Sequence, residues 1–158
     1  MNRGLRWSVV GSLALLSGCQ WVVPPTHSGT VPQGAPFQVS ATIGNVDLVG
    51  NAAGCVGAPS TWTIGPPVGP TVVPIPVPPL GMSNLDPLPP GYAYTCFQDA
   101  NPVPPQFEAI TFDITPDTTG VFDLYWHVEN IANPVNFQNV TTQVVVQPSN
   151  NLPTVQLD

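Results

Sequence analysis

The sequence is almost without cationic side chains. Arg3 and Arg6 are the only lysine or arginine residues among 158, whereas nine aspartates and glutamates lie between Asp47 and Asp158. Proteins that bind nucleic acid neutralise phosphates with lysine and arginine, so this composition excludes nucleic-acid binding. It also excludes electrostatic attraction to anionic lipid headgroups.

Helical patterning is missing as well. After residue 20 no apolar stripe recurs with the helical period, and the chain holds 22 prolines and 14 glycines. No nucleophile stands with a base and an orienting group, as catalysis would require. The sequence therefore predicts an all-β chain with long loops that is not an enzyme.

The first residues have the pattern of an export signal. The two arginines precede an uncharged, apolar run at Trp7–Ser17, which is too short to span a bilayer. The run ends in Leu16–Cys19 (LSGC), which resembles the lipobox of bacterial lipoproteins. That resemblance implies cleavage before Cys19 and a diacylglyceryl group on its thiol. An ordinary secretory signal followed by an unrelated cysteine is the alternative.

The resemblance has consequences for localisation and charge. Gln20 stands where aspartate would signal inner-membrane retention, which favours the outer membrane in a diderm cell. Cleavage removes residues 1–18 with both arginines, so the formal net charge changes from −7 to −9. Lipid on Cys19 leaves Cys55 and Cys96, which we expect to form a disulfide in an oxidising compartment. Free thiols that bind a metal or act as a redox pair are the alternative.

The rest of the chain divides into a tether, one domain and a tail. Prolines make residues 19–36 an expected extended tether that carries the lipidated cysteine, and residues 148–158 form a polar tail. The domain, residues 37–147, carries a proline-rich insert at 66–90, in which Val73–Pro78 is expected to form an edge strand with Val73, Ile75 and Val77 facing the core. A polyproline recognition ligand is the alternative, since residues 67–70 and 76–79 match P-x-x-P. Gly44 and Asn45 end the first alternating segment, and Gly50–Ser60 is rich in glycine, alanine and asparagine. Alternating apolar residues predict strands at 37–43, 61–64, 91–97, 108–114, 121–129 and 140–146.

Three segments resemble known bacterial domains. Asp113–Gln147 resembles the last two strands of bacterial immunoglobulin-like domains. Pro36–Asn45 and Leu88–Tyr94 resemble the opening strand and the Pro-Gly turn of the cell-adhesion-related domain found in bacteria. The resemblance implies an immunoglobulin-like antiparallel β-sandwich of about seven strands, with the proline-rich segment as an insertion.

Candidate binding residues are few. Asp113, Asp117 and Asp123 bracket a turn and could offer oxygen ligands to Ca²⁺. His127 and Glu129 share the outward face of a strand, where we expect a solvated histidine rather than a metal ligand.

Two functions follow from the sequence. The first is a non-enzymatic, lipid-anchored cell-envelope protein that acts as a structural or protein-interaction module. Its membrane contact is the N-terminal lipid, and its partners are other envelope proteins, as for an adhesin-like protein or a subunit of an envelope complex. The second is a small metal- or ligand-binding envelope lipoprotein.

Overall fold

The structure is a computed structural model that describes residues 19–27, 29–45, 51–75, 82, 84–99 and 106–149. The predicted signal, residues 1–18, and residues 150–158 of the predicted tail lie outside the described residues. Within the described part every regular element is a β-strand. No helix suited to crossing a membrane occurs there.

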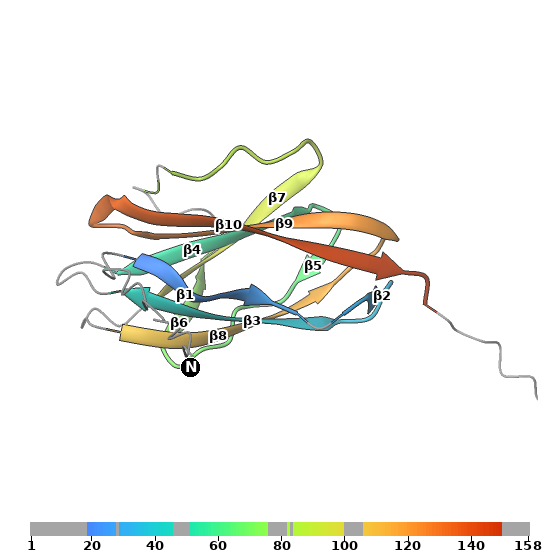
Figure 1. The fold of residues 1–158 in the computed structure, drawn as a ribbon, viewed down its shortest axis with the longest axis horizontal. Coiled ribbons are helices and arrows are strands. Elements are labelled where there is room, and N and C mark those ends of the chain that lie inside the picture. The colour runs from blue at the N-terminus through green and yellow to red at the C-terminus, as the bar shows by residue number, and fades with distance from the viewer. Residues whose placement is uncertain are drawn as a thin grey trace, which may run out of the picture.

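The strands form two sheets that pack face to face (Figure 1). The four-stranded sheet contains, in spatial order, β1 (Cys19–Thr26), β3 (Phe37–Asn45), β8 (Gln106–Thr115) and β5 (Thr63–Ile64). The six-stranded sheet contains β2 (Val31–Pro32), β10 (Asn133–Gln147), β9 (Gly120–Asn130), β4 (Ala52–Pro59), β7 (Tyr92–Asp99) and β6 (Val72–Ile75). Neighbours are antiparallel except β2 and β10, which are parallel.

This strand order is that of an immunoglobulin-like sandwich. In such folds strands A, B, E and D form one sheet, and strands G, F and C form the other with up to two more strands beside C. Here β1, β3, β8 and β5 take the first four places, and β10, β9 and β4 take the next three. The predicted all-β sandwich is therefore confirmed. The chain departs from the common path after β4, since it visits β5 and then the edge strand β6 before β7.

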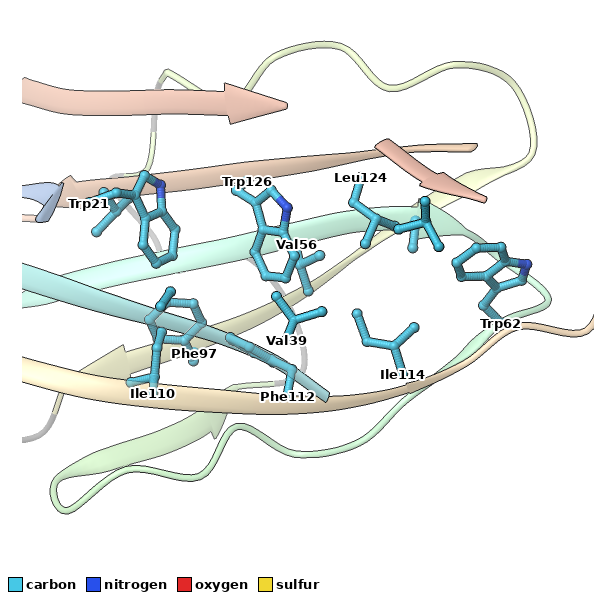
Figure 2. Packing of buried hydrophobic residues seen from close by; sticks show 14 of the residues in the cluster. Trp21, Val39, Val56, Trp62, Phe97, Ile110, Phe112, Ile114, Leu124 and Trp126 are labelled. Atoms are coloured by element: carbon cyan, nitrogen blue, oxygen red, sulfur yellow. The ribbon is translucent and has the colours of Figure 1, made fainter. Parts of the chain in front are cut away.

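The core is a row of apolar side chains between the sheets, from Trp21 at one end to Trp62 at the other (Figure 2). In its middle Trp126 of β9 packs on Phe112 of β8, with ring centroids 5.5 Å apart. The Trp126 indole donates a hydrogen bond to Thr142 Oγ1 at 2.8 Å, so its polar atom is satisfied. Each such buried side chain stabilises the fold by about 1.5–3 kcal/mol.

The predicted tether is wrong for most of its length. β1 begins at Cys19 and pairs with β3, and the Trp21 ring packs 6.2 Å from that of Trp126. Prolines suggested a linker, but β1 is an edge strand, where a missing N–H leaves the ladder intact. Register shifts after Trp21 and Val23 accommodate the irregular backbone. Residues 19–26 thus belong to the sandwich.

The segment Gly50–Ser60, which has no alternation of apolar and polar residues, contains the central strand β4. Its residues are small because both faces of β4 are covered. A Cβ at Gly54 would lie 2.4 Å from Phe97 Cζ on the core side, and one at Gly57 would lie 2.4 Å from Leu88 Cδ2 on the outer side. Close packing, rather than a turn, selects these glycines.

The proline-rich insert forms an edge strand only in part. β6 confirms the predicted edge strand at residues 72–75, whereas residues 76–81 lie outside the described part. Val72 packs against the core while Val73 is 43% exposed, so the predicted facing is reversed. Met82 and residues 84–90, which we call the covering segment, contact the outer face of the six-stranded sheet through Met82, Asn84 and Leu88.

Candidate functional site

Cys19 lies at one end of the sandwich. Its Cα partner is Asn45 at the end of β3, and Asn45 is opposite Gln106 at the start of β8. At the same end of the other sheet, the hairpin between β9 and β10 turns at Asn130–Asn133. Trp21 N–H donates to Gln138 Oε1 at 2.7 Å and joins the two sheets there. We call this end, at the left of Figure 1, the Cys19 end.

Cys55 and Cys96 form the expected disulfide. They are Cα partners on β4 and β7, so the bond joins adjacent strands of one sheet rather than the two sheets. Closing a loop of this sequence separation, 41 residues, stabilises the fold by about 4 kcal/mol in the chain-entropy view. The pair is therefore not available as free thiols in this structure.

The expectation for His127 is wrong. The side chains of His127 and Glu129 are 2% and 0% exposed, with His127 Nε2 3.0 Å from Glu129 Oε2. His127 Nδ1 lies 2.5 Å from Asn139 Oδ1, so both ring nitrogens face oxygen acceptors. His127 and Glu129 therefore form a buried, hydrogen-bonded pair.

The covering segment explains this burial. Asn84 Nδ2 donates to Glu129 Oε2 at 3.3 Å and to Pro134 O at 2.5 Å. Asn139 Nδ2 donates to the carbonyl of Asn84 at 3.4 Å, which orients Oδ1 of Asn139 toward His127. Phe137 stacks on the imidazole with centroids 6.1 Å apart. Because both ring nitrogens are engaged, His127 is not placed to act as a base on a substrate.

The covering segment also contacts half-buried tyrosines further along the same sheet. Tyr94 O–H donates to the carbonyl of Asp86 at 2.7 Å, and the Tyr92 and Tyr125 rings lie 5.8 Å apart. Burial raises the pKa of both Tyr92 and Tyr94 above 10.0, and nearby negative charge adds to the effect. These hydroxyls stay protonated at physiological pH.

A second buried cluster surrounds Thr71. Its hydroxyl lies 2.6 Å from Asp99 Oδ1 and 2.5 Å from Glu108 Oε2, and its N–H donates to Glu108 Oε1 at 2.8 Å. Asp99 and Glu108 are 2% and 8% exposed. A hydroxyl has one proton, so Thr71 donates to one of the two carboxyl groups at a time.

The three candidate calcium ligands do not come together. Asp113 is paired with Gln38 in the four-stranded sheet, Asp117 follows β8, and Asp123 is paired with Gln143 in the six-stranded sheet. Among all described residues, no three histidine, cysteine, aspartate or glutamate side chains gather around a possible metal position.

A shallow hollow of about 230 Å³ lies at the Cys19 end. Asn51, Gln98, Ile131 and Ala132 line it, from the ends of β4 and β7 and from the β9–β10 turn. These side chains carry no charge, and none is a catalytic acid, base or nucleophile.

Sequence reasoning missed both buried polar clusters. Alternation correctly put His127 and Glu129 on the outward face of β9, but a distant segment covers that face. A weak signal was present, since the proline-rich insert is long enough to cross a sheet and contains Asn84, whose amide can pair with both an acid and an amide.

No protein family and no curated protein matches this sequence. Solved structures with a similar fold include the CARDB domain of a Pyrococcus furiosus protein, crystallised in complex with di-metal ions. That domain is 15% identical, has a TM-score of 0.46, and the match covers 86% of this chain and 97% of that one. It is of the adhesion-related class that residues 36–45 and 88–94 resemble.

Two other structures show comparable likeness. A non-cellulosomal cohesin from Archaeoglobus fulgidus is 11% identical with a TM-score of 0.44, over 85% of this chain and 94% of the cohesin. A PapD-like domain of human CEP192 is 12% identical with a TM-score of 0.38, over 91% of this chain and 97% of that domain. At such identities the likeness concerns the fold alone.

Proposed function

We propose that the protein is a non-enzymatic lipoprotein of the bacterial cell envelope, anchored by lipid on Cys19, whose sandwich binds other envelope proteins. The observation that carries the proposal is the lipobox-like sequence Leu16–Cys19 (LSGC), which follows an uncharged, apolar run. The pairing of Cys19 with Asn45 places the thiol-bearing residue directly beside the sandwich.

The chemistry of the described residues supports binding rather than catalysis. Buried polar side chains of the sandwich form hydrogen bonds with other side chains of the same chain, as those of His127, Glu129, Asp99 and Glu108 do. Exposed carboxylates such as Asp113 and Asp117 have no lysine or arginine beside them in the mature chain. A protein partner with a basic surface would complement this charge.

The anchor is tested by the intact mass of the protein extracted with detergent from membranes of a bacterial host. We expect a chain that starts at Cys19 and carries a diacylglyceryl group, with or without a third acyl chain. The Cys19→Ser variant should keep its signal and lose the lipid mass. An unmodified Cys19, or cleavage at another bond, would contradict the proposal.

Digestion gives an independent check of processing. Because no lysine or arginine follows Arg6, trypsin should leave the mature protein uncut even after denaturation.

A density gradient of host membranes then tests the expected outer-membrane position. Chemical cross-linking on intact cells before detergent extraction tests the interaction role, and recovery of the protein uncross-linked to any envelope protein would count against it.

A further inference from the structure

The chain that follows Cys19 sets the distance between the sandwich and a membrane that holds the lipid. A proline-rich tether of 18 residues would have held the domain on the order of 50 Å away. β1 instead pairs with β3 from Cys19 onward, so no flexible chain separates the lipid-bearing residue from the sandwich. Val22 follows by only about 10 Å along the strand. Lipid on Cys19 therefore brings this end of the domain to the bilayer surface.

Exposed apolar side chains gather at this end. Phe107, 55% exposed, is opposite Gly44, whose other neighbour across the sheet is Gln20. Val135, 78% exposed, lies near the β9–β10 turn, three residues before the glutamine that bonds to Trp21. Six of the nine exposed large hydrophobics among the described residues are at the Cys19 end, and we call these six the end patch: Val22, Val23, Val73, Phe107, Val135 and Phe137.

Gly44 makes part of the end patch continuous. A Cβ at this position would lie 2.5 Å from Val22 Cγ2 and 3.1 Å from Phe107 Cε1. With no side chain between them, Val22 and Phe107 close over the glycine from the two neighbouring strands. The outer face of the four-stranded sheet is therefore apolar where β1 begins.

The exposed carboxylates of the described residues, unlike the exposed apolar side chains, do not gather at the Cys19 end. Asp47 and Asp158 lie outside the described residues, which leaves seven of the nine carboxylates. The three described carboxylates at the Cys19 end, Asp99, Glu108 and Glu129, are all buried. The exposed Asp113 and Asp117 lie toward the other end, where β8 finishes. Among the described residues, transfer of the Cys19 end into a membrane interface therefore takes no exposed carboxylate out of water.

We infer that the end patch is a membrane-contact surface, so that the sandwich stands on the lipid bilayer with its Cys19 end in the interface. The inference rests on the proposed lipid anchor and adds a second, non-covalent contact to it. The contact is apolar, because the mature chain has no lysine or arginine with which to bind acidic headgroups. It holds the acidic end of the sandwich toward soluble or neighbouring partners.

The test uses the mature chain, whose disulfide leaves Cys19 as its one free thiol. Cys19 is alkylated with one saturated C14 chain, since a single chain gives only marginal binding on which a second contact is measurable. Binding to neutral phosphatidylcholine vesicles is measured by flotation. We expect Phe107→Ser to lower the partition coefficient about tenfold, because about half of an aromatic side chain is no longer transferred from water.

The matched control is Val121→Ser, at an exposed valine near the opposite end of the sandwich, which should leave the partition coefficient unchanged. Brominated lipid should also quench the fluorescence that the substitution Phe107→Trp adds, and it should not quench the fluorescence that Val121→Trp adds. Equal binding of the Phe107→Ser and unsubstituted chains, or no vesicle binding by the alkylated chain, would overturn the inference. So would loss of a co-purified envelope protein from Phe107→Ser without any change on vesicles, since the patch would then bind protein.

Failure of this inference is distinguishable from failure of the lipid anchor. The acyl chain is installed chemically, so the vesicle result does not depend on processing in the cell. If Cys19 is lipidated in the host and Phe107→Ser leaves vesicle binding unchanged, only the membrane contact is refuted. Unmodified Cys19 in the host would refute the anchor, whatever the vesicles show.

Discussion

The buried hydrogen-bonded pair of His127 and Glu129 predicts strong coupling in a double-mutant cycle. The substitutions are His127→Leu, Glu129→Leu and both together, since leucine removes the polar group without leaving a large cavity. Each single change removes a hydrogen-bond partner from a side chain that is 2% or 0% exposed. Such a loss lowers the free energy of unfolding by about 3 kcal/mol, because the remaining buried polar group keeps its desolvation cost.

The double variant should be far less damaging than the sum of the single ones. In the double variant neither polar group remains buried, and the amides of Asn84 and Asn139 each lose a hydrogen bond to the pair. We expect a coupling free energy of at least about 2 kcal/mol. For a domain of this size each kcal/mol lowers Tm by about 2–4 °C, so each single change should lower Tm by about 10 °C.

Urea unfolding of the mature, disulfide-bonded chain at constant pH measures all four free energies. The matched control is His27→Leu, because His27 is half-buried and makes a single hydrogen bond, to the carbonyl of Gln143 at 3.0 Å. That change should cost about 1 kcal/mol. Single substitutions at 127 and 129 that each lower the free energy of unfolding by under about 1 kcal/mol, or losses that simply add, would show that the two side chains are not coupled.

Three further predictions concern packing, hydrogen bonding and titration. Gly54→Ala should lower the free energy of unfolding by about 3 kcal/mol, since its Cβ would meet an aromatic ring and lie 2.7 Å from a backbone carbonyl oxygen. Gly57→Ala should lower it by under about 1 kcal/mol, because its Cβ meets the flexible end of a leucine side chain. Equal urea midpoints for the two variants would contradict this. Thr71→Val should cost about 2–3 kcal/mol in the same assay and Thr71→Ser much less, because the hydroxyl joins two buried carboxyl groups; a stable valine variant would show that they need no donor. The raised pKa of Tyr92 and Tyr94 means that the folded chain holds these protons longer than the unfolded chain, so the stability that they contribute is complete below pH 10.0 and is lost as pH rises through the folded values. Absorbance at 295 nm checks the titration, and two tyrosines that ionise at their ordinary pKa would refute it.

Strands with alternating residues were predictable from sequence. Around Val39, Phe112 and Trp126 each inward apolar residue is flanked by polar ones, and the structure buries all three. Such a strand carries its own evidence, since one face must leave water whatever the partner strand is. The Cys55–Cys96 pairing was likewise predictable, once Cys19 was assigned to lipid.

Strands defined by their neighbours were not predictable. β4 has no alternation, because the close approach of Phe97 on one side and Leu88 on the other requires small residues on both faces. β1 looked like a linker, because its prolines are compatible with an edge strand only if that edge exists. Neither condition can be read from the segment itself.

The amino-acid sequence by itself determined the all-β class, the lack of cations after residue 6 and the disulfide partners. Outside the proline-rich insert it also determined the face to which each alternating side chain points, because this depends on residue type and local period. Only the tertiary structure decided whether an outward face meets water. The covering segment buries His127 and Glu129, while nothing in the described part covers Phe107, because solvent exposure depends on which distant segment crosses a face. The same long-range pairing, between β1 and β3, brought Cys19 into the sandwich.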